Sequence, residues 1–352
     1  MSNNQWSNMD KIAMRRCLDL ARSGLGHTKS NPLVGCVIVQ NGEVIGEGYH
    51  QYFGGPHAEV NAISSVADEA RLAGSTLYVN LEPCSHHGKT PPCANLIIEK
   101  RIGKVVIAHL DPHELVRGNG IKRLKEAGVD VLVGVLEEEA RELNKRFFTW
   151  CDKGRPYIIL KWAQTADGFI DYYRNDDSTG PLKISGYQTD VLVHKWRAEE
   201  DAILVGRNTV ELDDPSLTAR LWPGKSPLRI IIDPQLQLSN NYQLFKDGRE
   251  TWIYNALKDA QSGSIRFIQI NNAEKYPQEI VRHLSQHHVG GIIIEGGHTT
   301  LKRFIEAGLW DEARVILSPI RIGQGVPAPD LSGTPVFVEM IASDQISIFR
   351  NA

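Results

Sequence analysis

Three side chains suited to metal binding lie in the first half of the sequence. His57 precedes Glu59 by two residues, and Cys84 and Cys93 enclose a loop rich in glycine and proline. One imidazole and two thiolates supply three protein ligands, the set that a zinc ion uses when its fourth tetrahedral position stays open for water. A chain that binds zinc in this way has to bring the start of one helix and the loop after the next strand to a single point.

Ordinary structural roles account for most cysteines in a chain of this kind. A free cysteine is usually a small buried hydrophobe, and this interpretation suits Cys17, Cys36 and Cys151. It does not suit Cys84 and Cys93, because both flank one turn-rich loop that follows a strand pattern. The helix that is expected to begin at Cys93 also favours a thiolate at its N-terminus. We therefore interpret this pair, with the preceding histidine, as zinc ligands.

The spacing of these residues indicates a reaction class. An H-x-E sequence followed by P-C-x-x-C is typical of zinc-dependent base deaminases, and the chain matches it except that eight residues separate Cys84 from Cys93. Bound zinc lowers the pKa of its water to about 7 and provides a nucleophile at neutral pH. Glu59 is expected to carry the proton of that water to the ring nitrogen and the departing amine, which predicts hydrolytic deamination of an amino-substituted nitrogen heterocycle. His86 and His87 are expected to shape the substrate pocket rather than to bind a second metal.

Composition and charge narrow the classes of protein further. The chain has 352 residues, more than one hydrophobic core usually supports, so two domains are expected. Its net charge of −3 lacks the basic excess of proteins that bind nucleic acid. No apolar run approaches the length of a membrane span, and the first residues lack a signal-peptide pattern. The odd number of cysteines, five, argues for reduced thiols, so we expect a cytoplasmic protein without membrane or nucleic-acid partners.

Alternating strand and helix patterns predict an α/β fold in the first half. Residues 10–23 have helical spacing, and two strands over 34–39 and 43–48 are joined at Asn41-Gly42, a strong hairpin signal. Strands and helices then alternate as far as one long helix predicted over 137–150. This order favours a largely parallel sheet covered on both faces, with the hairpin as an antiparallel edge.

The second half is interpreted as another α/β domain. A short polar linker at 152–156 separates expected domains over 1–152 and 153–352. The strand patterns predict a mixed sheet, and helices are fewer than in the first half. Expected strands begin at 157 and cover 202–205, 228–232, 251–254, 266–270, 291–294 and 312–317, and expected helices cover 188–198, 277–287 and 299–307.

The motifs around the proposed zinc ligands resemble the deaminase half of the bifunctional riboflavin-biosynthesis deaminase/reductase family. The resemblance rests on residues 31–35 (NPLVG), 55–60 (GPHAEV) and 81–93 (LEPCSHHGKTPPC). It implies a cytidine-deaminase-like three-layer α/β/α domain, in which the long loop between the cysteines helps to bind a phosphoribosylaminopyrimidine. The implied roles are Zn²⁺ binding by His57, Cys84 and Cys93, catalysis by Glu59, and substrate binding by Asn31, Lys89 and Asp111.

A glycine pair in the second half is a candidate phosphate site. The apolar strand 292–294 runs into Gly296 and Gly297 and then into a helix. Glycine allows backbone N–H groups to approach an anion at a helix N-terminus, although a plain strand-to-helix turn accounts for the pattern equally well. No G-x-G-x-x-G sequence follows a strand, so the standard dinucleotide-binding fingerprint is absent.

The second half as a whole resembles the reductase half of the same family. The resemblance rests on residues 161–168, 197–206, 213–220 and 295–297, together with Thr209. It implies a dihydrofolate-reductase-like α/β domain that uses NADPH. The implied NADPH contacts are Ala163, Thr209, Asp213, Gly297, His298, Thr299, Thr300 and Leu301, and the implied substrate contacts are Arg197, Leu217, Arg220 and Glu295.

Two segments depart from the pattern of this family. At 183–186 the chain reads K-I-S-G where the family commonly has W-I-T-S, so Lys183 replaces an aromatic residue expected against the nicotinamide. At 111–114 it reads D-P-H-E where the family usually has D-P-N-P.

The leading hypothesis is a two-domain enzyme of riboflavin synthesis that acts on a small molecule. It would deaminate 2,5-diamino-6-(5-phosphoribosylamino)pyrimidin-4(3H)-one and reduce the ribosyl group to give 5-amino-6-(5-phosphoribitylamino)uracil. One alternative is a nucleic-acid or nucleoside zinc deaminase with an appended nucleotide-binding domain, which predicts a basic, aromatic groove and a short loop between the cysteines. Another is a non-catalytic nucleotide-binding protein, whose structural zinc would need a fourth protein ligand and no Glu59. A homo-oligomer is expected only by analogy with the family.

Overall fold

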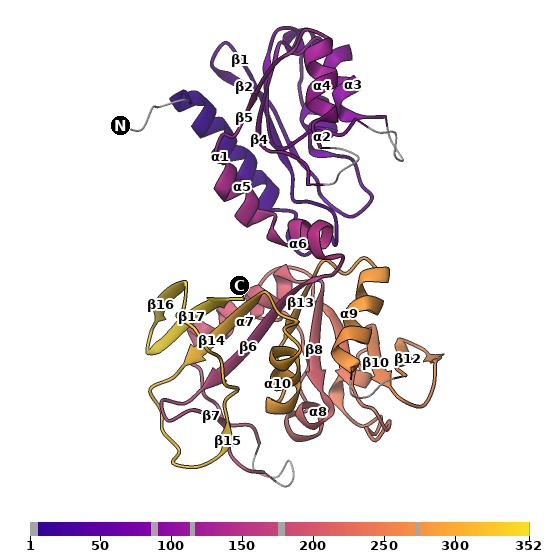
Figure 1. The fold of residues 1–352 in the computed structure, drawn as a ribbon, viewed down its shortest axis with the longest axis vertical. Helices are drawn as coiled ribbons and strands as arrows, with labels where there is room; N and C mark the ends of the chain where they lie inside the picture. The colour runs from indigo at the N-terminus through magenta and orange to yellow at the C-terminus, as the bar shows by residue number, and fades with distance from the viewer. Residues whose placement is uncertain (1–5, 86–90, 113–116, 175–179, 272–274, 352) are drawn as a thin grey trace. The chain divides into compact units, whose positions relative to one another are not determined.

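The chain divides into two compact units, Met1–Gly154 and Arg155–Ala352. The computed structural model describes residues 6–85, 91–112, 117–174, 180–271 and 275–351 (Figure 1). Within these residues, no helix combines the length and the apolar character needed to cross a membrane.

The first unit is built on a five-stranded sheet with the strand order β2-β1-β3-β4-β5. Strands β3, β4 and β5 run parallel, and β1 pairs antiparallel with both β2 and β3. The strands are β1 (Gly35–Gln40), β2 (Glu43–Tyr49), β3 (Thr76–Leu81), β4 (Lys104–His109) and β5 (Asp130–Val133). The helices are α1 (Asn8–Arg22), α2 (Ala58–Ser64), α3 (Cys93–Glu99), α4 (Asn119–Glu126), α5 (Glu137–Leu143) and α6 (Lys145–Lys153), with a short 3-10 helix η1 (Glu69–Leu72).

The predicted hairpin is confirmed. β1 and β2 pair antiparallel across Asn41 and Gly42, and both of these residues have left-handed backbones, with φ of 53° and 80°. Two consecutive left-handed residues match the twist of the flanking strands, which is why Asn-Gly favours this turn.

Helices cover both faces of this sheet, as its continuously apolar strands predict. One face packs against α1 and α5, and the other packs against α2, α3 and α4 (Figure 1). Glycine allows the closest approaches between these layers. A Cβ atom at Gly35 would lie 2.0 Å from the carbonyl oxygen of Cys17 in α1, and one at Gly48 would lie 2.3 Å from the backbone nitrogen of Ala62 in α2.

The single helix predicted over 137–150 is wrong, because the chain breaks it at Asn144 into α5 and α6. The buried Asn144 side chain accepts a hydrogen bond from the backbone N–H of Leu33 (2.8 Å) and donates one to its carbonyl oxygen (2.9 Å). The side chain of Asn144 therefore provides hydrogen-bond partners for the backbone N–H and carbonyl groups of Leu33, which lies outside the strands. The backbone of Asn144 itself departs from the helical conformation, with φ of −95° and ψ of 17°.

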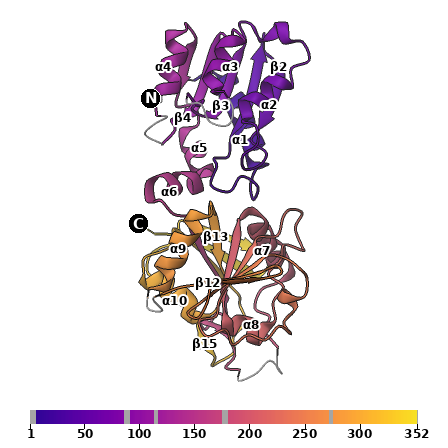
Figure 2. The same ribbon diagram turned by 90° about the vertical axis from the view of Figure 1, so that its right-hand side faces the viewer.

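The second unit contains a ten-stranded sheet in the order β11-β12-β10-β9-β8-β13-β6-β14-β17-β16, and β7 and β15 form a separate pair. Helices α7 and α8 cover one face, and α9 and α10 cover the other (Figure 2). The strands are β6 (Tyr157–Gln164), β7 (Phe169–Asp171), β8 (Ala202–Gly206), β9 (Leu228–Ile232), β10 (Thr251–Asn255), β11 (Ala260–Ser262), β12 (Ile265–Gln269), β13 (Gly291–Ile294), β14 (Glu312–Leu317), β15 (Val326–Pro327), β16 (Phe337–Ile341) and β17 (Asp344–Arg350). The helices are α7 (Tyr187–Glu199), α8 (Arg207–Asp213), α9 (Tyr276–Gln286) and α10 (His298–Glu306), with a 3-10 helix η2 (Gln243–Phe245).

The expected mixed sheet is confirmed, and the strands predicted from the sequence form its centre. The sequence pattern does not predict β7, β11, β15, β16 and β17. Several of these strands are very short, all of β11 is exposed, and nearly all of β16 is exposed. An exposed strand lacks the alternation of buried and exposed side chains on which a strand prediction depends.

Replacing Gly48 by alanine should destabilise the first unit. The added methyl group would overlap the backbone of α2, the helix that carries Glu59, and we expect a loss of about 3 kcal/mol in the free energy of unfolding. Gly186→Ala is the matched control, because its Cβ would lie 3.6 Å from the nearest atom, Asp344 Oδ2. Denaturant unfolding checks the expectation, and equal stability of the two variants would contradict it.

Candidate active sites

The three expected zinc ligands come together in the first unit. His57 is the N-cap of α2, Cys84 follows β3, and Cys93 is the first residue of α3. One nitrogen of the histidine and the two sulfur atoms all lie within 4.8 Å of one another. His57 Nδ1 is 3.6 Å from Cys84 Sγ and 3.3 Å from Cys93 Sγ.

This geometry fits a zinc ion. Tetrahedral zinc with normal bond lengths to sulfur and nitrogen separates these two ligand atoms by roughly 3.6 Å, close to both distances here. The backbone N–H of Cys93, at the start of α3, donates a hydrogen bond to Cys84 Sγ (3.3 Å). Hydrogen bonding from the side chain of Cys93, together with His57, lowers the pKa of the Cys84 thiol below its ordinary value, which favours the thiolate that binds metal.

Glu59 lies in the first turn of α2, two residues after His57. Its side chain is buried beside the cluster, and a hydrogen bond links it to the thiol of Cys93. Burial raises the pKa of its carboxyl, and the nearby charge of His57 opposes this shift. A carboxyl group held this close to a metal site is placed to exchange protons with whatever occupies the fourth coordination position.

Asn31, an expected substrate residue, is oriented by a histidine that the sequence analysis does not single out. His50 Nδ1 lies 2.9 Å from the carbonyl oxygen of Pro56, and His50 Nε2 lies 3.1 Å from Asn31 Nδ2. Burial lowers the pKa of His50, so the neutral ring donates to Pro56 through Nδ1 and accepts from Asn31 through Nε2. This bond fixes the amide of Asn31 and leaves its Oδ1 outside the contact with His50. A lone histidine after a strand gives no sequence signal for such a role.

Glu82 is a second residue that sequence reasoning misses. It follows β3 directly, and its buried carboxylate accepts hydrogen bonds from the backbone N–H groups of Asp111 (3.4 Å), Gly118 (2.9 Å), Gly120 (3.0 Å) and Ile121 (3.3 Å). The carboxylate thereby ties the segment that carries Asp111 to the loop that carries Cys84. The available signal is an acidic residue between a buried strand and Pro83-Cys84.

Part of the expected site lies outside the described residues. This holds for Lys89, for His86 and His87, and for the second half of the 111–114 segment.

In the second unit, three charged side chains meet beside the central strands. Arg197 of α7 donates two hydrogen bonds of 2.7 Å to the carboxylate of Glu295, and Lys161 of β6 lies 3.6 Å from the same carboxylate. The parallel register that pairs Leu160 with Ile294 places Lys161 and Glu295 side by side. The sequence gives no separate signal for a role of Lys161, although this residue lies in a segment that resembles the family.

The charged groups of this cluster shift the pKa values of one another. Burial raises the pKa of Glu295, but the charges of Arg197 and Lys161 outweigh it and lower the value to about 2. Burial lowers the pKa of Lys161, and Glu295 opposes that shift. Glu295 is therefore a carboxylate at neutral pH, and it holds the guanidinium of Arg197 in one orientation.

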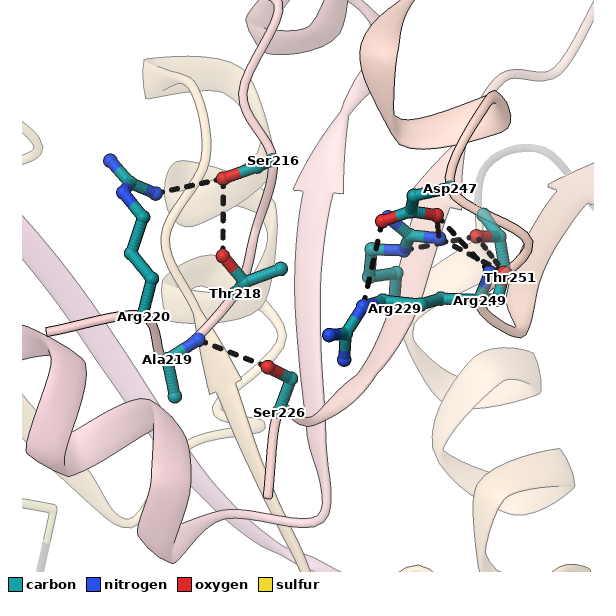
Figure 3. A network of polar contacts seen from close by, with 9 residues as sticks. All are labelled: Ser216, Thr218, Ala219, Arg220, Ser226, Arg229, Asp247, Arg249 and Thr251. Carbon is teal, nitrogen blue, oxygen red and sulfur yellow. Dashed lines mark hydrogen bonds and ion pairs between the residues drawn. The ribbon is translucent and has the colours of Figure 1, made fainter. Parts of the chain in front are cut away.

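The segment that carries Leu217 and Arg220 runs beside α7. Arg197 donates to the carbonyl oxygen of Thr218 (3.3 Å), and Arg220 donates to the hydroxyl of Ser216 (2.8 Å), which in turn contacts the hydroxyl of Thr218 (Figure 3). Leu217 has a left-handed backbone, with φ of 52°, and its side chain is buried in the core. Arg220 therefore offers an exposed cation near Arg197, whereas Leu217 can contact a ligand only through its backbone.

Figure 3 also shows a buried arginine with a structural role. Arg229, at the start of β9, pairs bidentately with Asp247 (2.8 and 2.7 Å) and donates to Thr251 Oγ1 (3.1 Å) and to the carbonyl oxygen of Arg249 (2.9 Å). All of these partners belong to the start of β10 or to the loop before it, so this network joins two neighbouring strands.

The expected cofactor turn lies where two helices begin. β8 and β13 are adjacent and parallel, so α8 and α10, which follow them, start next to one another. A Cβ atom at Gly206 would lie 2.7 Å from Thr300 Oγ1, and one at Gly297 would lie 3.5 Å from Thr209 Oγ1. Gly297 has φ of 66°, a backbone that glycine adopts most readily. Two helix N-termini with small residues between them suit a pyrophosphate group.

The remaining residues that are expected to bind the cofactor differ in their burial and in their contacts. Leu301 lies on the buried face of α10. His298 and Thr299, in the same helix, line an open cavity of about 530 Å³ between α9 and α10. His298 Nδ1 lies 2.9 Å from the carbonyl oxygen of Pro327. Asp213, at the end of α8, forms an ion pair with Arg174.

Ala163 and Lys183 lie in the two described ranges that end at residue 174 and begin at residue 180. Ala163 is half-buried near the end of β6. Lys183, which replaces the aromatic residue of the family pattern, is exposed and forms an ion pair with Asp190 of α7.

Two family models match the chain, one in each unit. Residues 7–109 match the cytidine and deoxycytidylate deaminase zinc-binding region, and residues 156–347 match the RibD C-terminal domain. Together with the two clusters described above, these matches define a zinc-dependent deaminase joined to a reductase.

Similar proteins cover almost the whole chain. The riboflavin biosynthesis protein RibD of Aquifex aeolicus is 40% identical over 329 residues, which are 92% of this chain and 90% of the relative. The RibD protein of Escherichia coli is 37% identical over 332 residues, 89% of each chain. The chain belongs to the RibD family, the bifunctional deaminases and reductases of riboflavin biosynthesis.

Solved structures agree with this assignment. The crystal structure of a diaminohydroxyphosphoribosylaminopyrimidine deaminase/5-amino-6-(5-phosphoribosylamino)uracil reductase from Thermotoga maritima has a TM-score of 0.87 and 35% identity, covering 98% of this chain and 99% of that one. Acinetobacter baumannii RibD has a TM-score of 0.86 and 31% identity, with the same coverage.

The family assignment settles several expectations. The cytidine-deaminase-like and dihydrofolate-reductase-like folds, the two enzymatic activities, and the use of zinc and NADPH are confirmed. Neither the nucleic-acid deaminase nor the non-catalytic nucleotide-binding protein is supported.

Removing the carboxylate of Glu82 should loosen the deaminase site. Glu82→Ala leaves four backbone N–H groups without their acceptor, and we expect a loss of roughly 3 kcal/mol in the free energy of unfolding, since one buried unsatisfied donor alone costs about 1–3 kcal/mol. Zinc affinity should fall as well, because Cys84 lies two residues further along. Denaturant unfolding and zinc content by mass spectrometry measure the two effects. Glu82→Gln, which retains one acceptor oxygen, should lie between the wild type and Glu82→Ala, and wild-type values for both variants would contradict the assignment.

Proposed function

We propose that this chain deaminates 2,5-diamino-6-(5-phosphoribosylamino)pyrimidin-4(3H)-one and then reduces the deaminated product to 5-amino-6-(5-phosphoribitylamino)uracil. The convergence of His57, Cys84 and Cys93 beside a buried Glu59 carries the first half of the proposal. The activities named for the Thermotoga maritima relative support both substrates. We assign the deaminase to residues 1–152 and the reductase to 153–352, in accord with the two compact units and the ranges of the family matches.

In the deaminase site, the chain's own residues hold the metal, move protons and position the substrate. His57, Cys84 and Cys93 hold zinc, which when bound supplies an activated water as the nucleophile. Glu59 would accept one proton of the water and pass it to the ring nitrogen, and it would then pass the second proton of that water to the departing amine, which leaves as ammonia. Asn31, fixed by His50, binds the pyrimidine.

Two further residues complete the proposed substrate contacts of the deaminase. Lys89 contacts the base or the phosphate. Asp111, on the segment tied down by Glu82, is assigned to the same part of the substrate.

In the reductase site, NADPH when bound supplies a hydride to C1 of the ribosylamino group. We assign its binding to Ala163, Thr209 and Asp213 and to the turn at 297–301, where two helices begin. Substrate binding is assigned to Arg197, Leu217, Arg220 and Glu295. Arg197 keeps part of its guanidinium free of Glu295, and an oriented guanidinium suits a sugar phosphate.

The cysteines and the net charge support a proposal for the cellular location of the protein and for its partners. All five cysteines are free thiols, which supports an enzyme of the cytoplasm. We propose a small-molecule substrate and no nucleic-acid partner, in agreement with the slight negative net charge of −3.

A direct assay tests the assignment of substrates. The purified protein is incubated with the diaminopyrimidine named above, first without NADPH and then with it. Ammonia release in the first step and loss of NADPH absorbance in the second are expected. Absence of ammonia with this substrate, from protein that contains zinc, would overturn the deaminase assignment.

Glu59→Gln should abolish deamination and leave the rest of the enzyme intact. The amide has nearly the same shape but cannot carry the proton, and we expect ammonia release to fall by about 10³-fold, within the range that proton transfer contributes. Zinc content should stay at the wild-type level, and reduction of the separately prepared deaminated intermediate should be unchanged. Ammonia release at the wild-type rate would remove Glu59 from this role.

Arg197→Ala should weaken reduction without affecting ammonia release. The variant removes the oriented guanidinium and leaves Glu295 with Lys161 as its remaining cation, so we expect KM for the reductase substrate to rise at least about tenfold, the effect of losing one charge-assisted hydrogen bond. Lys195→Ala is the matched control, because it removes a 41% exposed cation from the same helix. Arg197→Lys should restore little, since an ammonium group cannot pair bidentately, and equal KM for all of these proteins would count against the assignment.

A further inference from the structure

Arg174, shortly after β7, has a buried side chain to which the proposed function assigns no role. Only 2% of this side chain is exposed. Its Nε donates a hydrogen bond to Asp171 Oδ2 (2.9 Å), its Nη1 donates one to the carbonyl oxygen of Leu212 (2.9 Å), and its Nη2 donates to both Asp171 and Asp213. These bonds engage most of the N–H groups of the guanidinium. Any role of Arg174 in ligand binding therefore has to act through its partners.

Asp171 is a fixed partner of Arg174. It is the last residue of β7, and its backbone pairs with Val326 of β15. Its Oδ1 accepts hydrogen bonds from the backbone N–H groups of Tyr172 (2.9 Å) and Leu182 (3.1 Å). Because both the backbone and the carboxylate of Asp171 are held, the guanidinium that pairs with this carboxylate is held in one place as well.

Asp213, the second acidic partner, occupies an unfavourable position for a carboxylate. It is the last residue of α8, and the C-terminal end of a helix carries a partial negative charge. Burial raises the pKa of its carboxyl, and the hydrogen bond from Arg174 opposes this shift. Arg174 also binds the carbonyl group of Leu212, which lies in the last turn of α8, where C=O groups lack helical partners. Arg174 thus stabilises both the end of α8 and the negative charge on it.

The face of α8 that carries Asp213 also faces the expected cofactor turn. Thr209 and Asp213 are separated by one helical turn, so their side chains lie on the same face of α8. Thr209 in turn is next to Gly297, since a Cβ atom at that glycine would lie 3.5 Å from Thr209 Oγ1. A cofactor that binds at this turn can therefore reach the carboxylate of Asp213 along the same face.

We propose that Arg174 is a positioning residue of the reductase, which holds the Asp213 carboxylate charged and in one orientation to accept a hydrogen bond from a ribose hydroxyl of NADPH. The proposal rests on the assignment of Asp213 to NADPH binding made above. The contact with Arg174 uses Oδ1 of Asp213 and leaves Oδ2 outside it. A carboxylate accepts hydrogen bonds and repels a phosphate group, so a hydroxyl group of the cofactor is the partner that suits Oδ2.

The experiment measures the KM for NADPH of the full chain at saturating concentration of the deaminated substrate. Arg174→Met removes the charge and keeps much of the length of the side chain. We expect its KM for NADPH to rise about tenfold, the effect of losing one charge-assisted hydrogen bond. The rate at saturating NADPH and the KM for the other substrate should stay at the wild-type values, because the lost contact serves only to bind the cofactor.

A double-mutant cycle shows whether Arg174 acts through Asp213. Asp213→Asn alone should also raise the KM for NADPH, and the double variant should have the same KM as Asp213→Asn, since no carboxylate is left to position. Two independent effects would instead multiply to about 100-fold. A multiplied effect, or a wild-type KM in Arg174→Met, would overturn the role of Arg174 and leave the assignment of Asp213 in place. A wild-type KM in Asp213→Asn would overturn both.

A control separates positioning from a general loss of stability. Arg229 is equally buried, with 1% of its side chain exposed, and it also pairs with an aspartate, Asp247. Arg229→Met should lower the free energy of unfolding and leave the KM for NADPH unchanged, and an equal rise in its KM would overturn the proposal. Circular dichroism and wild-type ammonia release show that each variant is folded. If Arg174→Met does not fold, the cycle is run with Arg174→Lys, which keeps the charge but cannot pair in the fork geometry and should raise the KM severalfold only while Asp213 is present.

Discussion

The convergence of His57, Cys84 and Cys93 is the constraint on which the deaminase unit depends. The three ligands come from the starts of α2 and α3 and from the end of β3, so the helices have to pack tightly against the sheet for the ligand atoms to lie within 4.8 Å of one another. Glycine makes this possible at Gly48, where any side chain would push α2 away. The geometry of the metal site therefore depends on how closely these helices pack against the sheet.

The loops around the metal are held by buried polar side chains rather than by regular structure. Glu82 binds four backbone N–H groups. Asn144 and Asn80 both hydrogen-bond to the backbone of Leu33, just after Asn31. Buried backbone groups need partners, and here carboxylate and amide side chains provide them where no strand or helix does. The segment around Leu33 is therefore fixed without being part of a helix or strand.

The sequence predicts the order of elements and the zinc ligands well, because both depend on local spacing. The Asn41-Gly42 hairpin, the helix start at His57 and the apolar central strands are examples. It does not predict His50, Glu82 or Lys161, since their importance comes from partners 19 to 134 positions away along the chain. The break at Asn144 is missed for the same reason, because its cause is Leu33, 111 residues earlier. Edge strand β16 is missed because it has no buried face.

The cluster of Arg197, Lys161 and Glu295 has an electrostatic consequence for any ligand that binds beside it. One carboxylate faces two cations, and burial lowers the pKa of Lys161, so that of the two cations Lys161 gives up its proton more readily. An anion bound nearby stabilises the protonated amine and so raises the pKa of Lys161 toward its ordinary value. Binding of an anion would then be accompanied by proton uptake at any pH at which Lys161 is partly deprotonated, and linkage requires the affinity for the anion to fall as the pH rises through this transition. A neutral ligand would not raise this pKa through its charge, so the proton uptake would depend on the charge of the ligand.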